Sequence, residues 1–387
     1  MRTQVAIVGS GPAGLLLSQI LHQHGIESVI LEQRNRAYIE GRVRAGVLEQ
    51  GTVDLLNEAG VGARMAKQGL RHEGFDIALN GRRKRVDLAG LTDGKTVTVY
   101  GQTEVTKDLI NARLDAGGMV LFEAEDVAPR GFNGDEPSLS FVHDGRRREL
   151  GCDFIAGCDG FHGICRASFP KGSIRTFERV YPFAWLGVLV DAPPPSEELI
   201  YCRDTRGFAL FSMRSSTVSR SYLQCTPDED LREWSDDRVF EELQRRLGKT
   251  GTVNEGKVLE KSVTPMRSFV AEPLRSGRLF LAGDAGHIVP PTGAKGLNLA
   301  ASDVRYLATA LIAYYQSGNE SLLEAYSATA LERVWKAQRF SAWMTTLLHN
   351  TGRDGFEDRI RLAELEYVLQ SEAALTSLAE SYVGLPF

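Results

Sequence analysis

Three glycines and one acid near the start of the chain have the types and spacing that hold a dinucleotide. In QVAIVGSGPAGLLLSQILHQHGIESVILEQ, Gly9, Gly11 and Gly14 follow an apolar run, and Glu32 lies 18 residues after Gly14. Glycines at these places allow a tight turn, close approach of a pyrophosphate and close helix–strand packing, while an acid can bind the ribose. The strand–glycine–helix context favours a nucleotide cradle over an ordinary glycine-rich turn. The motif is compatible with FAD or NAD.

Two later stretches also place an acid at the end of an apolar strand. DFIAGCDGFHGICRASF (153–169) contains Asp159 and Arg166, and RLFLAGDAGHIVPPTGAKGLNLA (278–300) contains Asp284 before a helix that starts near Gly296. Asp284 can hold a sugar hydroxyl, and the helix can direct its N–H groups at an electron-rich ring edge. Pro291 offers a carbonyl without an N–H, either as a rigid acceptor or as a loop stiffener.

The segment ELIYCRDTRGFALFSMRSSTVSRSYLQC (198–225) alternates in the manner of antiparallel strands. Residues two apart share a face of a strand, so Tyr201, Ser212, Arg214 and Tyr222 can line one surface together with apolar side chains. Arg214 could bind a carboxylate with two parallel N–H bonds. The periodicity fits a pocket for a small aromatic acid and an ordinary half-exposed sheet about equally well.

The elements that must position these residues belong to an ordinary globular chain. It has 387 residues, 43% hydrophobic and 25% charged, with a net charge of −5. The length suggests several domains, and the charge argues against nucleic acid or an anionic membrane as the main partner. No stretch reaches the ~18 apolar residues of a membrane span. The early glycines also argue against a signal peptide.

The five cysteines match no zinc pattern, so we expect free thiols, no metal site and a cytoplasmic location.

Together the three motifs resemble those of the FAD-dependent aromatic hydroxylases. The following longer stretches, which span essentially the whole chain, resemble the 4-hydroxybenzoate 3-hydroxylase family in particular: RVRAGVLEQG (42–51), VTVYGQTEVT (97–106), FIAGCDGFHG (154–163), HIVPPTGAKGLNLAASDV (287–304) and YVGLPF (382–387).

The resemblance implies an α/β (α+β) fold in three segments. Residues 1–175 would form a Rossmann-like FAD-binding domain, and residues 176–268 an antiparallel β-sheet substrate-binding domain. Residues 269–387 would hold the Gly-Asp FAD segment and a helical C-terminal region. The long amphipathic stretch 331–348 predicts core packing first and a homodimer face second.

The resemblance also implies the reaction. FAD, reduced by NADPH or NADH, would react with O2 to a flavin C4a-hydroperoxide that hydroxylates 4-hydroxybenzoate to 3,4-dihydroxybenzoate. The same chemistry on a related benzoate, a flavin oxidase or dehydrogenase, and a non-catalytic binding protein are the alternatives. The retained Tyr201, Tyr382 and Arg214 argue against an oxidase, and the retained cofactor motifs argue against a binding protein.

Site residues follow from the matching motifs. The predicted FAD contacts are Gly9, Gly11, Gly14, Glu32, Arg42, Val43, Arg44, Ala45, Gly46, Val47, Gln102, Asp159, Asp284, Gly296, Leu297 and Asn298. The predicted substrate contacts are Tyr201, Ser212, Met213, Arg214, Tyr222 and the carbonyl of Pro291. Tyr201, Tyr382 and His72 would carry the phenol proton to solvent, His72 because its ordinary pKa is near neutral. Pro291 completes the predicted catalytic set.

The nicotinamide donor has no dinucleotide fold of its own, because the single GxGxxG motif serves FAD. The predicted donor contacts are Arg34, Tyr38, Arg42, Arg44, His162, Arg166 and Arg267. Gln33 departs from the basic residue that the family's best-known members have there. Arg34 and Arg36 bring positive charge nearby, so the sequence favours NADPH and leaves NADH open.

Overall fold

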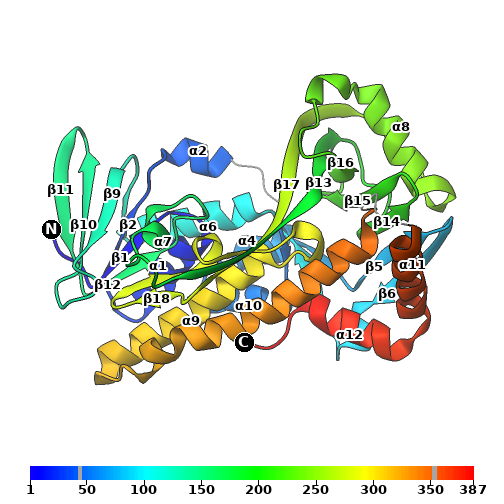
Figure 1. The fold of residues 1–387 in the computed structure, drawn as a ribbon. Coiled ribbons are helices and arrows are strands. Elements are labelled where there is room, and N and C mark those ends of the chain that lie inside the picture. The colour runs from blue at the N-terminus through cyan, green and yellow to red at the C-terminus, as the bar shows by residue number, and fades with distance from the viewer. Residues whose placement is uncertain (42–45, 351–354) are drawn as a thin grey trace.

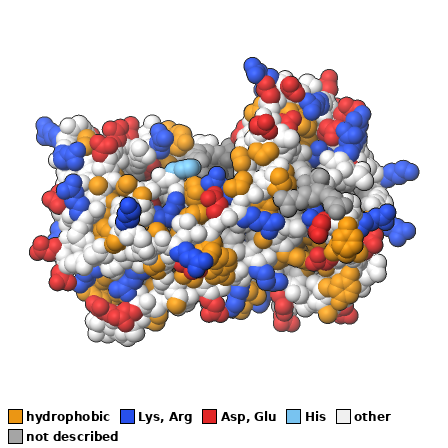
Figure 2. Space-filling view, viewed as in Figure 1, with side chains coloured by type: hydrophobic (Ala, Val, Ile, Leu, Met, Phe, Trp, Pro, Cys, Tyr) orange, Lys and Arg blue, Asp and Glu red, His pale blue; other side chains and the backbone are white. Residues whose placement is uncertain are grey.

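The computed structural model describes residues 1–41, 46–350 and 355–387. Arg42, Val43, Arg44 and Ala45, which the sequence assigns to FAD and the donor, lie outside the described residues. Within the described ranges, no helix is long and apolar enough to cross a membrane. Basic and acidic side chains are interspersed over the face in Figure 2. All five cysteines are free thiols, as predicted, and Cys225 is the least buried of them.

The nucleotide-binding part is built on a six-stranded sheet with the order β18-β19-β12-β1-β2-β8. All neighbouring pairs are parallel except the β18–β19 pair. A parallel sheet of this kind needs cover on both faces, which explains the fully buried VAIV run of β1. The strands are β1 (Val5–Val8), β2 (Ser28–Leu31), β8 (Met119–Leu121), β12 (Phe154–Gly157), β18 (Arg275–Ser276) and β19 (Leu279–Leu281).

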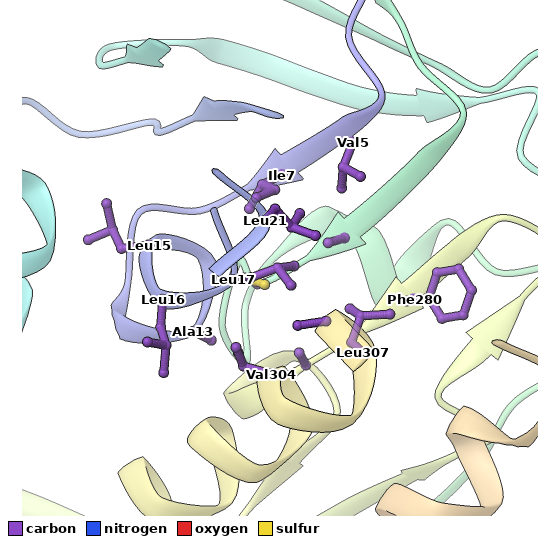
Figure 3. Close-up of a cluster of buried hydrophobic side chains, with 14 of the residues drawn as sticks. Val5, Ile7, Ala13, Leu15, Leu16, Leu17, Leu21, Phe280, Val304 and Leu307 are labelled. Carbon is purple, nitrogen blue, oxygen red and sulfur yellow. The ribbon is translucent and has the colours of Figure 1, made fainter. Parts of the chain in front are cut away.

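Helices carry the side chains that cover this sheet. Figure 3 shows Ile7 of β1 lying near Leu17 and Leu21 of α1, with Val304 and Leu307 of α9 closing the cluster. The helices of this part are α1 (Pro12–Gln23), α2 (Arg36–Gly41), α3 (Gln50–Glu58), α4 (Ala63–Gln68), α6 (Gln102–Asp115), α7 (Ile164–Ala167) and α9 (Gly296–Ser317). Helix α5 (Leu88–Leu91) lies instead in the second lobe, where Leu88 joins a hydrophobic cluster. Two short 3₁₀ turns, η3 (Gly283–Ala285) and η4 (Pro291–Gly293), lead into α9.

Two small sheets flank the nucleotide-binding part. One contains β9 (Glu125–Arg130), β10 (Ser138–His143) and β11 (Arg146–Gly151) in the order β11-β10-β9. Its tight hairpin turns at Asp144-Gly145, where both residues have positive φ. The other contains β3 (Val47–Leu48), β4 (Leu70–His72) and β7 (Val97–Val99) in the order β3-β7-β4. In the second sheet β7 lies between the strands that carry Val47 and His72.

The second lobe is an eight-stranded sheet with the order β20-β17-β13-β16-β15-β14-β5-β6. The long strands β13 and β17 pair with each other and run from the nucleotide-binding part into this lobe (Figure 1). The strands are β5 (Gly74–Leu79), β6 (Arg82–Asp87), β13 (Arg175–Asp191), β14 (Ile200–Asp204), β15 (Gly207–Met213), β16 (Ser219–Cys225), β17 (Lys257–Glu272) and β20 (His287–Ile288).

Helices cover both faces of the large sheet. Helix α8 (Asp236–Leu247), flanked by η1 (Leu231–Glu233) and η2 (Gly248–Thr250), packs on one face. The C-terminal helices α10 (Ser321–Leu348), α11 (Gly355–Gln370) and α12 (Glu372–Val383) share a hydrophobic cluster with the other. Phe340, Met344 and Leu347 of α10 are buried there, as the core-packing prediction for 331–348 expects.

The mixed fold class predicted from the sequence is confirmed. Strands β5 and β6 come from the segment 1–175 but pair into the large sheet, and residue 268 lies inside β17. The three-domain division at 175 and 268 stays a prediction.

Candidate active site

The three glycines of the first motif occupy three different environments. Gly9 has φ of 102°, and a Cβ there would lie 2.4 Å from the carbonyl oxygen of Cys158. A Cβ on Gly14 would lie 2.1 Å from the carbonyl oxygen of Gly9, whereas a Cβ on Gly11 would meet nothing within 4 Å. Gly9 and Gly14 are therefore needed by the fold, and Gly11 keeps the backbone open to a ligand.

Glu32 at the end of β2 has a buried carboxylate that organises the glycine loop. It accepts hydrogen bonds from Ser10 N at 2.8 Å, from Ser10 Oγ at 2.9 Å and from Arg34 N at 2.8 Å. The acid predicted to bind ribose thus lies beside the glycine loop. Sequence reasoning missed Ser10, although its place inside GSGPAG is a signal that could have found it.

Asp159 caps a short helix rather than standing free at the strand end. Its Oδ2 accepts from Cys165 N at 2.8 Å, and burial raises the pKa of its carboxyl. Its Oδ1 is buried without a hydrogen-bond partner among the described residues. A Cβ on Gly163 would lie 2.0 Å from the Asp159 carboxyl carbon, so the motif requires that glycine.

Arg166 joins the second motif to the third. Its guanidinium donates to Ala285 O at 2.7 Å and to Phe161 O at 2.5 Å, and it lies over the ring of Phe269. Arg267 also stacks on the ring of Phe161. The exposed His162 packs its ring edge-on against Phe161. Three of the predicted donor contacts therefore gather around one aromatic ring.

The remaining described donor residues lie on α2 and just before it. Arg34 is exposed, and its guanidinium lies 5.2 Å from the centre of the Tyr38 ring. Arg36 forms an ion pair with Glu40 at 2.6 Å, so the negative charge of Glu40 is paired.

Asp284 lies in η3, and the segment around it is held by a buried pair that sequence reasoning missed. The Asp303 carboxylate on α9 accepts from Gly283 N at 2.8 Å and contacts His287 Nε2 at 2.6 Å. Asp303 raises the pKa of His287 against the opposing effect of burial. Asp303 is 20 residues away from Gly283 in the chain, and no local motif indicates the pairing.

The start of α9 draws four predicted FAD residues together. Asn298 accepts from Glu49 N at 2.9 Å and donates to Val47 O at 3.0 Å. A Cβ on Gly46 would lie 1.9 Å from Tyr100 O and 2.7 Å from Gln102 N. Gly46, Val47, Gln102 and Asn298 therefore lie around one junction, and Gly296 and Leu297 form the adjoining first turn of α9.

The predicted pocket residues Tyr201, Ser212 and Tyr222 lie on one side of the large sheet. Tyr201 pairs with Leu210, and Leu210 pairs with Tyr222, so the three lie in register across β14, β15 and β16. Ser212 is buried and pairs with Arg220. Met213 is buried in the same hydrophobic cluster as Tyr201. The alternation read from the sequence is therefore present in the structure.

Arg214 lies at the end of β15 beside Tyr222. Its guanidinium donates to Met213 O at 3.0 Å and to the Tyr222 hydroxyl at 3.4 Å. Its Nε is buried without a hydrogen-bond partner among the described residues. A buried cationic donor of this kind suits a carboxylate ligand.

Two buried tyrosine hydroxyls meet where β14 approaches α12. Tyr201 Oη and Tyr382 Oη are 2.7 Å apart, and Tyr201 also donates to Thr292 O at 3.2 Å. Both side chains are buried, and burial raises the pKa of each phenol well above its ordinary value. The hydroxyl of Tyr201 has one proton, and it forms the hydrogen bond to Thr292 O. The hydroxyl of Tyr382 is therefore the donor in its hydrogen bond with Tyr201.

Pro291 and His72 complete the account of the predicted residues. Pro291 O accepts a hydrogen bond from Ala294 N at 2.9 Å, and the carbonyl that accepts the hydrogen bond from the Tyr201 hydroxyl belongs to the next residue, Thr292.

His72 is buried, and its two ring nitrogens have no hydrogen-bond partner among the described residues. Burial lowers the pKa of His72. The structure therefore does not join His72 to Tyr382 by a direct hydrogen bond.

A buried charge cluster holds the C-terminal segment that carries Tyr382. Lys295 forms an ion pair with Glu49 and donates to Tyr382 O at 3.0 Å. Arg333 bonds Glu49 at 3.2 Å and Leu385 O at 2.6 Å. Sequence reasoning missed this cluster, because its members come from three distant segments.

Comparison with known proteins agrees with this geometry. An FAD-binding-domain family model matches residues 2–341. The p-hydroxybenzoate hydroxylase of Acinetobacter baylyi is 56% identical over all of this chain and 96% of its own length. The chain belongs to the p-hydroxybenzoate hydroxylase family of FAD-dependent aromatic hydroxylases. An uncharacterized aromatic compound monooxygenase of Bacillus subtilis, YhjG, is 25% identical over 84% of the chain and 65% of its own length.

The fold of this FAD-dependent monooxygenase recurs in more distant structures. The p-nitrophenol 4-monooxygenase PnpA of Pseudomonas putida superposes with a TM-score of 0.83 at 18% identity, with full coverage of both chains. The residues of the site fit FAD: Gly11 leaves its face open, Glu32 bonds the neighbouring Ser10, and Leu297 in the first turn of α9 lines the same small cavity as Pro12. These groups are chemically suited to phosphate, ribose and ring.

Proposed function

We propose that this monooxygenase converts 4-hydroxybenzoate to 3,4-dihydroxybenzoate. One atom of O2 enters the ring, the other leaves as water, and NADPH or NADH supplies the two electrons. The observation that carries the proposal is the buried pair of tyrosine hydroxyls, 2.7 Å apart, of which Tyr201 lies on the same sheet that carries Tyr222 and, just beyond β15, Arg214. The 56% identical relative, a p-hydroxybenzoate hydroxylase, supports it.

The carboxylate of the substrate would bind at Arg214. This side chain has a buried nitrogen to offer, and Tyr222 and Ser212 add hydroxyl donors near it. A bidentate arginine fixes the orientation of a planar acid as well as its charge. The apolar side chains around Tyr201 would enclose the ring.

The phenol end would lie at Tyr201. On binding, the Tyr201 hydroxyl would turn from Thr292 O to the phenol oxygen and accept or return its proton through Tyr382. Because burial raises the pKa of both tyrosines, they would pass a proton along rather than hold a negative charge. Loss of the phenol proton makes the ring carbon next to the oxygen more nucleophilic, which is what the hydroxylation requires.

His72 would be the outer group of this relay. Its lowered pKa keeps the imidazole neutral near pH 7, so it is ready to accept a proton. A water molecule or a small shift of the chain would be needed to connect it to Tyr382.

FAD, when bound, supplies the reaction with oxygen. In this chain Gly9, Gly11, Gly14, Glu32, Asp284 and the first turn of α9 would hold it, and Asp159 would support the loop beside it. The buried pocket would keep water from the reacting ring.

The electron donor would bind at the surface around Phe161 and α2. Arg34, Tyr38, His162, Arg166 and Arg267 would contact it, together with Arg42 and Arg44. NADPH is the favoured donor because several cations lie on this surface and a 2′-phosphate needs one. A homodimer and a cytoplasmic location complete the proposal, and the free thiols support the latter.

The test is oxidation of NADPH and NADH in air, with and without 4-hydroxybenzoate, followed by chromatography of the products. Strong stimulation by substrate with nearly one equivalent of 3,4-dihydroxybenzoate would support the proposal and identify the donor. Stimulation that yields mainly hydrogen peroxide would favour a related benzoate as the true substrate. Absence of stimulation with both donors would overturn the substrate assignment.

A further inference from the structure

A histidine with no part in the proposed reaction is buried among the aromatic side chains behind the pocket. His349 follows the last residue of α10 and has no exposed surface. Its ring stacks on Phe183 with centres 4.5 Å apart and planes 6° apart, and it lies 4.3 Å from the ring of Phe208. An apolar residue would fill this space at lower cost, so the imidazole needs an explanation.

Both ring nitrogens of His349 are used. Trp185 Nε1 donates to His349 Nε2 at 2.7 Å, and His349 Nδ1 lies 2.8 Å from Thr345 O. The indole can only donate and the carbonyl can only accept, so the ring is neutral with its proton on Nδ1. Burial supports this state by lowering the pKa of His349 to about 3. Few side chains other than a neutral imidazole can accept from one neighbour and donate to the other here.

Through its hydrogen bond with Trp185, His349 is connected to Tyr222, which is proposed to line the substrate pocket. Trp185 lies on β13, and its ring is 4.8 Å from the ring of Tyr222, which in turn accepts a hydrogen bond from Arg214. Rotation of the indole would therefore disturb the residues proposed to hold the substrate carboxylate. The hydrogen bond to His349 fixes the indole in place.

Through Thr345, His349 is connected to Thr292 and so to Tyr201. Thr345 Oγ1 and Thr292 Oγ1 share a hydrogen bond at 2.9 Å, and Thr292 O accepts from Tyr201 at 3.2 Å. His349 Nδ1 adds a second donor to Thr345 O in the last turn of α10, because that carbonyl also accepts the backbone N–H of His349 at 3.2 Å. The imidazole thus stabilises the turn that sets Thr292 opposite Tyr201.

We propose that His349 is a positioning residue for the aromatic pocket: it fixes Trp185 against Tyr222 through one nitrogen and the Thr345–Thr292 contact opposite Tyr201 through the other. This inference rests on the proposed function of the pocket. It assigns to one residue the alignment of both ends of the substrate.

Three substitutions separate the two contacts. His349→Phe keeps the stacking and loses both hydrogen bonds. In His349→Gln, the amide oxygen can occupy the place of Nε2 and accept from Trp185. In His349→Asn, the amide nitrogen can occupy the place of Nδ1 and donate to Thr345 O. Each holoenzyme would be compared with the wild type in KM for 4-hydroxybenzoate, in kcat, and in the share of NADPH oxidation that ends as hydrogen peroxide.

We expect His349→Phe to raise KM about tenfold and to increase the peroxide share, because a buried indole N–H then has no acceptor. His349→Gln should restore KM to within about threefold of the wild type, since it restores that acceptor. The indole N–H signal of Trp185, assigned with Trp185→Phe in ¹⁵N-labelled holoenzyme, should move in the Phe and Asn variants and return toward its original position in the Gln variant.

The outcomes are distinct. Wild-type kinetics in a folded His349→Phe enzyme would overturn the inference while leaving the proposed function intact. Equal defects in the Gln and Phe variants would also overturn it, because rescue by the matching acceptor is its specific consequence. If His349→Phe does not fold, the same comparison is made between the Gln and Asn variants, and equal KM values would contradict the role of the Trp185 contact. Failure of the wild-type enzyme to hydroxylate 4-hydroxybenzoate would overturn the proposed function and this inference with it.

Discussion

At the scale of the residue, the pocket depends on hydroxyl groups that stay protonated. Tyr201 and Tyr382 are both fully enclosed, and burial raises the pKa of each above its ordinary value of 10. A negative charge on either phenol would be costly there. The pair can therefore exchange protons with a bound phenol, but neither hydroxyl can serve as a lasting base.

Replacing Tyr382 with Phe tests this relay. Tyr201 would keep Thr292 O as a partner and lose its link toward solvent, so deprotonation of the bound phenol should slow. We expect hydroxylation turnover to fall at least about tenfold, while substrate still stimulates NADPH oxidation and hydrogen peroxide increases. Product analysis beside oxygen uptake measures both. Tyr315→Phe, which removes a hydroxyl bonded to Asp153 outside the pocket, should leave turnover unchanged; an equal loss in both variants would contradict the relay.

The sequence predicted the residues that sit inside local motifs and missed those defined by distant partners. Tyr201, Tyr222 and Ser212 were placed on one surface by strand alternation, and their register bears this out. Arg214 lies just beyond β15, beside Tyr222. His349 gave no signal, because its partner Trp185 is 164 residues away and nothing in the local pattern marks the contact. Arg166 stays a predicted donor contact, and its two hydrogen bonds to backbone carbonyls are a further structural role that the motif did not indicate.

At the scale of the element, two glycines of the loop before α1 have different roles: Gly14 is needed for packing of the fold, and Gly11 leaves room for the ligand. Gly14 lies where α1 packs against the loop, and Gly11 precedes Pro12 at the helix start with φ of −68°. That backbone conformation suits any residue. Only the space around each Cβ position distinguishes the two glycines.

Gly11→Ala and Gly14→Ala form a matched pair. The methyl group added by Gly14→Ala would lie 2.1 Å from Gly9 O, so we expect this variant to lose about 3 kcal/mol or more in the free energy of unfolding. Gly11→Ala should change this free energy by less than about 1 kcal/mol and weaken FAD binding at least about tenfold. Urea unfolding of the apoproteins and titration with FAD measure the two effects. Normal FAD affinity in Gly11→Ala would show that this face does not approach the cofactor.

At the scale of the whole molecule, two lobes share the long strands β13 and β17 (Figure 1). The motifs predicted the parallel nucleotide-binding sheet well, because each of its main strands ends in a recognisable loop. They did not predict that β5 pairs in parallel with β14, since residues such as Asp76 and Ile200 meet across more than a hundred positions. Pairing at that separation depends on packing against the C-terminal helices rather than on local propensity.

The histidines buried in this assembly give its stability a defined dependence on pH. His349 has an ordinary pKa of 6.5 when the chain is unfolded and about 3 in the fold. Between these values the unfolded state binds one more proton at this site, so lowering the pH favours unfolding. His287, whose pKa is raised, acts in the opposite direction, because its stabilisation is lost as the pH rises. The contribution of His349 must therefore be isolated by comparison with a variant.

We expect the wild-type holoenzyme to lose about 1.4 kcal/mol more free energy of unfolding than His349→Gln between pH 7.5 and pH 5.5. Glutamine does not titrate, so its variant lacks only this contribution, while His72 and His287 act equally in both proteins. Urea unfolding at several pH values gives the difference directly. Parallel curves for the two proteins would mean that the folded chain protonates His349 as readily as the unfolded chain does. The single hydrogen bond from Trp185 to Nε2 would then be absent, because a protonated ring has no lone pair left to accept it.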